Sequence, residues 1–249
     1  MKSIRPASRH LSHLAGFLLA ACVAAPAIGS DFSVSPVRVE LRQGALSETI
    51  TVANHAPGRL RVSAKLMEWT QDEQGNDVYK DSGEIVYFPR QLEVEAAGRR
   101  LIRVGSKSPA GPTERTYRLF IEEQPEPAAE GRAAQIAVYL RFGVPIFLPP
   151  AVPRVQADIG EPTLDKGKLS LQVRNGGNQH FRLVRIAVSD GASYQQEVAG
   201  WYSLAGTQKT YTLDIPADVC RRSRTLNVTI EGEGVRADRK LDVDPARCV

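Results

Sequence analysis

Residues 134–148, AQIAVYLRFGVPIFL, are the stretch that decides the fold of this chain. Apolar side chains alternate through its first half, in Ile136, Val138 and Leu140. This period of two predicts a β-strand. Pro145 cannot donate a ladder hydrogen bond, which favours a position at a sheet edge. Because long apolar edges invite pairing with other chains, we expect one of two arrangements. Either another part of this chain covers the edge, or the edge stays open to pair with a partner's backbone.

Short alternating segments on both sides of this run also predict strands. They are residues 49–53, 60–66, 101–104, 117–121, 169–173, 183–188, 211–215 and 226–230. Turn sequences such as Asn175-Gly176-Gly177-Asn178 separate them, and there is almost no helical period. The pattern predicts an all-β fold of two immunoglobulin-like sandwiches.

The domain boundary is expected at Leu148-Pro149-Pro150-Ala151-Val152-Pro153, where three prolines end a strand and stiffen a short link. We predict a signal peptide over residues 1–27, a first domain over 31–149 and a second over 150–249.

The first thirty residues have the layout of a secretory signal peptide. Three basic residues precede the apolar run 14–25, and Ala25-Pro26-Ala27 offers a cleavage site near Ala27. The alternative is a lipoprotein box at Leu19-Ala20-Ala21-Cys22, with lipid anchoring at Cys22. Either way we expect an exported protein.

Charge and cysteine content fit an exported protein, and we expect no nucleic-acid partner. The formal charge is +4, and the leader supplies three of these charges and no acid, which leaves about +1. Cys220 and Cys248 remain after cleavage and predict one disulfide in the second domain, linking the last strand back to the sheet. The alternative is two free buried thiols.

No catalytic or metal-binding set is present. His55 and His180 lie in turn-rich segments far apart in the sequence, without ligands at metal spacing. Nucleophile and phosphate-binding motifs are absent as well. We expect a non-enzyme without cofactor or metal, in which Trp69 and Trp201 are core residues.

A change of phase occurs in the first strand region, Phe32–Leu41. Apolar positions are even-numbered before Pro36 and odd-numbered after it. Such a shift predicts a bulge or a switch between sheets, and it places Arg38 opposite Val37 and Val39.

Several further motifs follow one another in a fixed order. They are Asn54-His55, Trp69 with Gln71 and Gly75, Tyr87-Phe88-Pro89, residues 100–104, residues 117–125, and residues 175–180. With the export signal and the apolar strand, they resemble the PapD-like periplasmic chaperones of chaperone–usher pilus pathways, most closely the archaic, spore-coat-U-associated branch.

The resemblance implies two immunoglobulin-like domains in an L or boomerang arrangement in the periplasm. It implies that the last strand of the first domain, called G1, is lent to a pilin subunit by donor-strand complementation. Ala134, Ile136, Val138 and Leu140 would fill the pilin groove, and an outer-membrane usher would receive the subunit. Free protein could self-associate through the G1 edge.

The resemblance also implies that basic residues anchor the pilin's terminal carboxylate. Arg38 matches the first-strand arginine of the family. The family's second basic residue, a lysine on G1, falls near Gly143, so Arg118 and then Arg141 are the remaining candidates. Arginine suits this role because its planar fork can hold a carboxylate bidentately.

Other classes of function stay open at this point. A pilin or adhesin subunit would share export, sandwiches and an apolar donor strand, but would carry that strand at its mature N-terminus. A secreted binding module and an exported hydrolase are less favoured, because aromatic residues are few and no nucleophile–base set exists.

Overall fold

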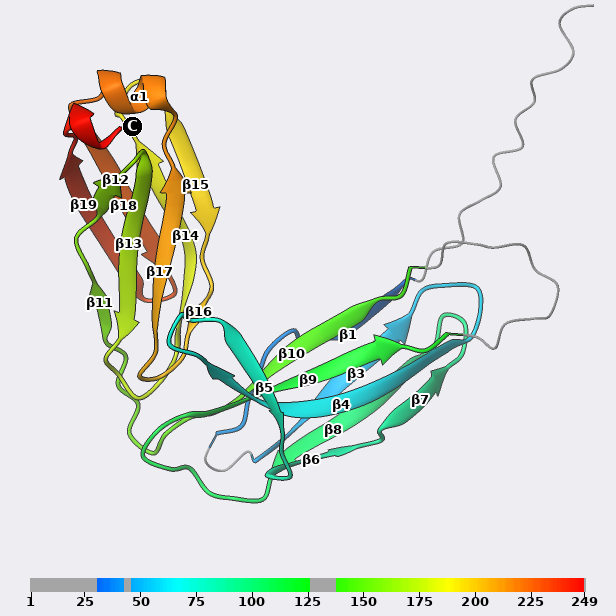
Figure 1. Cartoon of the computed structure of the whole chain (residues 1–249). Coiled ribbons are helices and arrows are strands. Elements are labelled where there is room, and N and C mark those ends of the chain that lie inside the picture. Colours follow the sequence, from blue (N-terminus) through cyan, green and yellow to red (C-terminus); the bar gives the residue numbers. More distant parts are fainter. Residues whose placement is uncertain (1–30, 43–45, 126–137, 249) are drawn as a thin grey trace, which may run out of the picture.

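The computed structural model describes residues 31–42, 46–125 and 138–248. The chain forms two β-structures set at an angle, like the two arms of an L (Figure 1). Each arm has its own buried core, one drawn from residues 32–148 and the other from residues 157–248. The predicted all-β class, with two immunoglobulin-like domains, is confirmed.

The first arm contains two sheets packed face to face. One has the order β1-β3-β8-β6, and the other has the order β2-β10-β9-β4-β5, with β7 also paired to β4. The strands are β1 (Phe32–Ser35), β2 (Val39–Glu40), β3 (Ser47–Asn54), β4 (Leu60–Gln71), β5 (Asp77–Asp81), β6 (Ile85–Phe88), β7 (Gln91–Val94), β8 (Arg99–Ser106), β9 (Arg115–Glu123) and β10 (Arg141–Leu148).

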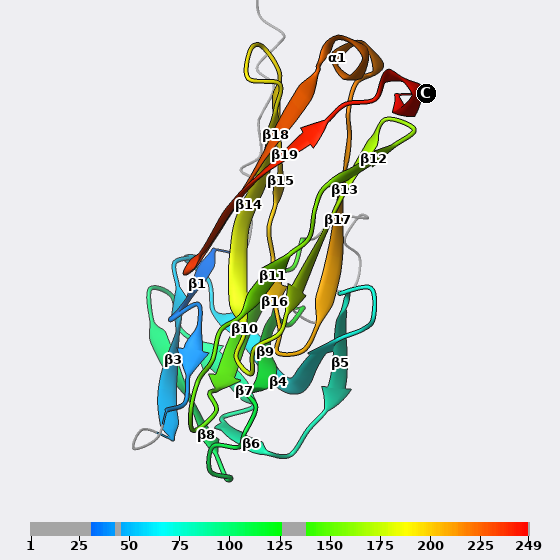
Figure 2. The ribbon, with the colours of Figure 1, turned by 90° about the vertical axis from the view of Figure 1, so that its left-hand side faces the viewer.

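The second arm repeats the plan of two facing sheets (Figure 2). One has the order β11-β13-β12 with β17 beside β13, and the other has the order β15-β14-β18-β19 with β16 beside β14. Its elements are β11 (Ala157–Ile159), β12 (Thr163–Asp165), β13 (Lys168–Asn175), β14 (Phe181–Ser189), β15 (Gln195–Ala199), β16 (Tyr202–Ser203), β17 (Gln208–Asp214), α1 (Ala217–Arg222), β18 (Thr225–Gly232), β19 (Val235–Asp242) and η1 (Pro245–Arg247).

Alternating side chains build both cores. In β4, Leu60, Val62, Ala64 and Leu66 are buried, while the residues between them face outward. The eight shorter segments predicted as strands lie in strands, apart from Ile215 directly after β17. In the run 134–148, the described strand covers only Arg141–Leu148, and residues 138–140 precede it. The strands that the sequence did not indicate, such as β15 and β19, are rich in polar residues. Strands β15 and β19 lie at the edges of their sheet, where each is paired on one side only.

Each arm contains a buried asparagine with the same local role. Asn54 accepts the N–H of Ala56 at its Oδ1 (3.0 Å) and donates from Nδ2 to the carbonyl of Gly58 (2.8 Å). Asn175 accepts the N–H of Gly177 (2.9 Å) and donates to the carbonyl of Gln179 (2.9 Å). Each asparagine therefore ends a strand and fixes the following turn.

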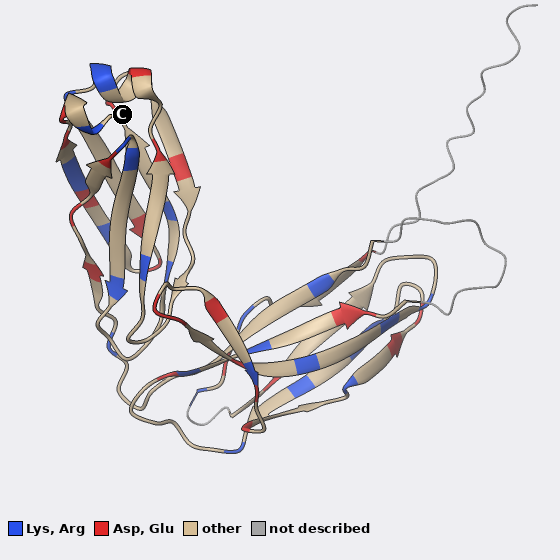
Figure 3. Cartoon of the chain, viewed as in Figure 1, with Lys and Arg blue, Asp and Glu red and all other residues tan. Residues whose placement is uncertain are grey.

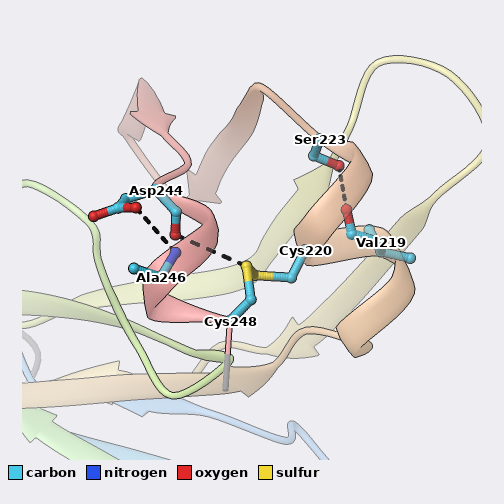
Figure 4. Close-up of a disulfide and its surroundings, with 6 residues drawn as sticks. All are labelled: Val219, Cys220, Ser223, Asp244, Ala246 and Cys248. Atoms are coloured by element: carbon cyan, nitrogen blue, oxygen red, sulfur yellow. Dashed lines mark hydrogen bonds between the residues drawn. A yellow bond between two sulfur atoms is a disulfide. The ribbon is translucent and has the colours of Figure 1, made fainter.

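The two cysteines are paired at the far end of the second arm (Figure 4). Their Cα atoms are 5.7 Å apart, which fits the predicted disulfide between Cys220 and Cys248. Cys220 lies in α1 and Cys248 follows η1, so the link joins two short helices. The expectation that it would tie a strand to the sheet is wrong.

Basic and acidic residues are interspersed along the strands of both arms (Figure 3). Within the described ranges, no helix has the length and apolar character needed to cross a membrane. The leader and its two alternative processing sites lie outside the described residues.

Candidate functional site at the edge of strand β10

Strand β10 is paired along its whole length on one side and only near its end on the other. Strand β9 pairs with all of Arg141–Leu148. On the other side, β2 runs parallel and pairs only with Ile146 and Phe147. In the described part of the chain, no strand pairs with Arg141–Val144 on that side. The predicted edge position is therefore confirmed for the first half of β10 and wrong for its end.

The unpaired edge presents the backbone groups of Arg141 and Gly143. The carbonyl of Leu140 accepts a hydrogen bond from β9 (3.0 Å), whereas that of Phe147 accepts one from the chain that continues β2 (2.8 Å). Backbone groups alternate in direction along a strand, so odd-numbered residues of β10 point away from β9. Pro145 is also odd-numbered, so its backbone faces away from β9, and as a proline it has no N–H that could donate there.

A switch between sheets explains why β2 covers only the end of β10. Strand β1 pairs with β3 in one sheet, and β2 pairs with β10 in the other. The crossing occurs at Pro36, as the change of phase in the sequence predicted. Val39 is buried after the crossing, but Val37 is exposed within it, so Arg38 does not stand opposite two buried valines.

The four predicted groove-filling residues all precede β10 in the sequence. Ala134 and Ile136 lie outside the described residues. Val138 is 72% exposed, whereas Leu140 is partly buried against the first core. The described strand begins only at Arg141.

Arg38 and Arg118 lie in one row across the sheet. Pro145 is paired with Arg118 on β9, and it stands beside Arg38 when the β2 pairing is continued by one residue. Two strand spacings separate the backbones of the arginines by about 10 Å. Arg141 lies four residues earlier, about 13 Å along the strand, so it stands apart from the other two.

Arg38 reaches across to the second arm. Its guanidinium donates to Glu233 Oε2 (2.7 Å), and Glu40 lies 3.6 Å away. The hydrogen bond from Arg38 lowers the pKa of Glu233, and the same bond raises the pKa of Arg38. This pair stays charged at neutral pH and remains open to solvent.

Arg118 is only 8% exposed and is held in an aromatic setting. Its guanidinium lies 4.1 Å from the ring centre of Trp69 and donates to the hydroxyl of Tyr79 (2.9 Å). Asp77 is 3.7 Å away. Burial raises the pKa of Tyr79 to about 12, so its hydroxyl stays protonated. Most of the surface of Arg118 is therefore already used by these contacts.

Gly143 makes room for Arg118. A Cβ atom at this position would lie 3.0 Å from Arg118 Cδ and 3.3 Å from the ring of Phe120. The family resemblance implies a lysine near Gly143. Here the side chain of Arg118, from the neighbouring strand β9, lies over this position instead. Arg141 instead pairs with Glu122 (2.6 Å) on the exposed face.

Aromatic side chains join the two arms beside this site. Trp69, Phe147 and Leu204 form a small buried cluster, and the ring of Phe147 stacks on His180 with centroids 3.7 Å apart. Trp69 is therefore a buried residue, as expected. Trp201 is 36% exposed and donates to Asp77 (3.1 Å), so its assignment to the core is wrong.

Polar contacts between the arms were not predicted. The backbone N–H and the ring Nδ1 of His180 both lie 2.8 Å from Glu114 Oε2, in a buried position. Gln71 accepts the N–H of Leu204 (3.1 Å) and donates to the carbonyl of Tyr202 (2.9 Å). The described residues contain no cluster suited to a metal ion.

This fold and edge define a class: two-sandwich proteins with an open strand at the end of the first domain. Residues 31–153 match the family model of the PapD N-terminal domain, described as a pili and flagellar-assembly chaperone. The first domain therefore belongs to the PapD-like family. No curated protein matches the sequence.

Solved structures show the same fold at low sequence identity. A chain of the CsuC–CsuE chaperone–tip adhesion subunit complex from archaic Csu pili of Acinetobacter baumannii matches with a TM-score of 0.60 and 16% identity, covering 84% of this chain and 97% of that one. The CupB2 chaperone of Pseudomonas aeruginosa matches with a TM-score of 0.52 and 15% identity, covering 85% and 100%. A chain of the Salmonella enterica SafA pilin–SafB chaperone complex matches with a TM-score of 0.51 and 14% identity, covering 86% and 96%.

Proposed function

We propose that this chain is a periplasmic chaperone that stabilises pilin subunits by lending them the edge of β10, and that it delivers them to an outer-membrane usher. The observation that carries the proposal is the backbone edge of Arg141 and Gly143, which no strand among the described residues pairs with, beside a covered strand end. An added strand would complete the ladder on that side, which is the mode of recognition called β-augmentation. Two of the solved structures that share this fold are complexes of a chaperone with a tip adhesion subunit or a pilin, which supports the kind of partner.

Val138 is the described residue best suited to enter a pilin groove, because it is exposed in the free protein. We assign Ala134, Ile136 and Leu140 to the same row, since alternate residues share one face of a strand. Leu140 already contacts the first core, so a polar substitution there would disturb folding as well as binding. Val138 alone therefore gives the cleaner test.

We further assign the pilin's terminal carboxylate to the row of Arg38 and Arg118, with Arg141 as the third candidate. Arg38 is the accessible member of this row, because its side chain is 37% exposed. Arg118 would stiffen the sheet beside it, through its contacts with Trp69 and Tyr79. The proposal includes export behind the leader of residues 1–27, and domains over residues 31–149 and 150–249.

Co-purification tests the proposed function. The mature chain is expressed with a pilin subunit that lacks its own last strand, and captured pilin is quantified. Val138→Asp should lower capture at least about tenfold, because a buried unpaired charge in the groove is costly. Val152→Asp is the matched control, since Val152 is 78% exposed and lies outside β10. Equal capture by both variants would exclude the assignment of the lent strand.

A further inference from the structure

Glu233 holds two arginines from different arms at once. It stands in the two-residue turn between β18 and β19, where its backbone N–H donates to the carbonyl of Arg182 (2.8 Å). Gly234 completes this turn with a φ of +70°, which glycine adopts without strain. Oε2 of Glu233 accepts from Arg38 (2.7 Å), and Oε1 lies 3.5 Å from a guanidinium nitrogen of Arg182.

The two oxygens of one carboxylate thus face two guanidinium groups, one from each arm. A main-chain terminal carboxylate carries the same pair of oxygens and the same charge. The three side chains are 37–44% exposed, so a ligand could reach the arginines without opening a core. Arg118 differs, because its side chain is only 10% exposed and its closest carboxylate is Asp77.

The position of Arg38 limits where an added strand can end. Strand β2 begins one residue after Arg38 and occupies the edge beside Ile146. A strand added parallel to β10 on the open edge would be in line with β2, and its C-terminal end would stop at Arg38. A strand added in the opposite direction would bring its N-terminal end there.

We propose that Glu233 occupies, in the free protein, the place that a partner's terminal carboxylate takes in the complex, and that Arg182 is the second accessible arginine of that anchor, beside Arg38. This inference rests on the proposed function and adds to it a residue from the second domain and an internal competitor. The incoming carboxylate displaces Glu233, and the proton balance does not change, because one ionised carboxylate replaces another.

The competitor should have a measurable but modest effect. Exposed ion pairs are weak, so removing Glu233 should strengthen carboxylate binding by about twofold to fivefold. The arms should stay in place, since the buried Glu114–His180 contact and the Gln71–Leu204 hydrogen bond do not involve Glu233.

The test uses a probe that needs no pilin. N-acetylalanine, with N-acetylalanine amide as the uncharged control, is titrated into the mature protein, and the side-chain Nε–H signals of Arg38 and Arg182 are followed by NMR. Glu233→Gln should shift both signals at a concentration about twofold to fivefold lower than wild type, and the amide should shift neither. Arg182→Ala should weaken binding of the carboxylate to Arg38.

Glu231→Gln is the matched control, because Glu231 lies two residues earlier and pairs with Arg185 (2.8 Å) and Arg236 (3.4 Å). It should behave as wild type. Equal affinities in wild type and Glu233→Gln, or an unchanged affinity in Arg182→Ala, would overturn the inference. Such a result would leave capture through the β10 edge intact, because that capture is measured separately with Val138→Asp.

Discussion

The two ends of strand β10 differ in how much of them the rest of the chain covers. Phe147, near the end, is fully buried, with β2 on its open side and the second arm over its ring. Val138, just before the start, is exposed, and within the described ranges no strand pairs with the outer edge of Arg141–Val144. One strand therefore serves as a structural joint at one end and as a binding edge at the other. A strand that is anchored in this way can be lent without unfolding its own domain.

The largest effect should come from the covered end. Phe147→Ala removes a buried ring between the arms and should lower the free energy of unfolding by about 3–5 kcal/mol. Val138→Asp at the open end should change it by less than about 0.5 kcal/mol. Urea denaturation of the two variants beside wild type measures both values. Similar losses for both would show that the two ends are equally structural.

The disulfide tests whether the binding edge depends on the far end of the second arm. Cys220 and Cys248 lie there, away from β10 (Figure 1). Replacing both by serine should cost the second domain about 3–4 kcal/mol, since the bond closes a loop of 28 residues.

Pilin capture by the folded double variant should remain within about twofold of wild type at a temperature well below its melt. Mass mapping of a non-reduced digest provides the control for the bond itself. Two free thiols in wild type would remove the disulfide, and a large loss of capture would show that the two ends of the molecule are coupled.

Substitutions of the two arginines beside Pro145 should have different effects, one mainly on pilin binding and the other mainly on stability. Arg38→Ala should weaken pilin capture roughly 30-fold or more, as expected when one member of a desolvated charge pair is lost. Its melting temperature should fall by only a few degrees. Arg118→Ala should instead cost about 1–3 kcal/mol of stability, because it leaves Asp77 and the face of Trp69 without their buried partner.

Capture assays beside thermal melts distinguish these outcomes. Arg141→Ala is the comparison variant on the lent strand, and it should reduce pilin capture less than Arg38→Ala does. If Arg141 gave the only large loss of capture, the anchor would lie on β10 itself.

The smallest effect should be the pH dependence of the contact across the arms. The pKa of Glu233 is lowered in the folded chain, chiefly by the hydrogen bond from Arg38. The contribution of Glu233 to the free energy of unfolding is therefore fully present at a pH above its pKa in the unfolded chain. It is lost as the pH falls through its lower pKa in the folded chain. Glu233→Gln should cost at most about 0.5 kcal/mol at pH 7. At a pH below the pKa of Glu233 in the folded chain, the variant and wild type should have the same free energy of unfolding. A difference that persists there would contradict this account.

Alternation of apolar residues was enough to predict the two-sandwich fold, since the eight shorter predicted segments lie in strands apart from Ile215. It did not place the start of β10, because residues 138–140 alternate as well but precede the strand. The change of phase at Pro36 predicted the switch between sheets, and the two cysteines predicted their pairing. Strands with polar faces, such as β19, could not be found in this way, because an edge strand needs few apolar side chains.

The candidate site was only partly predictable. The sequence indicated Arg38, Arg118 and the apolar run, but not which arginine would be buried, because Trp69, Tyr79 and Asp77 come from other strands. Contacts such as Glu114–His180 join residues 66 positions apart and leave no local pattern. In the sequence, Glu233 has the pattern of an ordinary surface acid in a turn. Only the fold brings Arg38 within hydrogen-bond distance of it.

The most direct test of the lent edge is hydrogen exchange at single amides of β10 by NMR. In the free protein, Arg141 and Gly143 should exchange fast, while Phe142 and Val144, which face β9, should be protected. In a complex with pilin, Arg141 and Gly143 should become protected as well, because their N–H groups then enter a ladder. Amides of Arg141 and Gly143 that still exchange fast in the complex would contradict the proposal that this edge is what the partner binds.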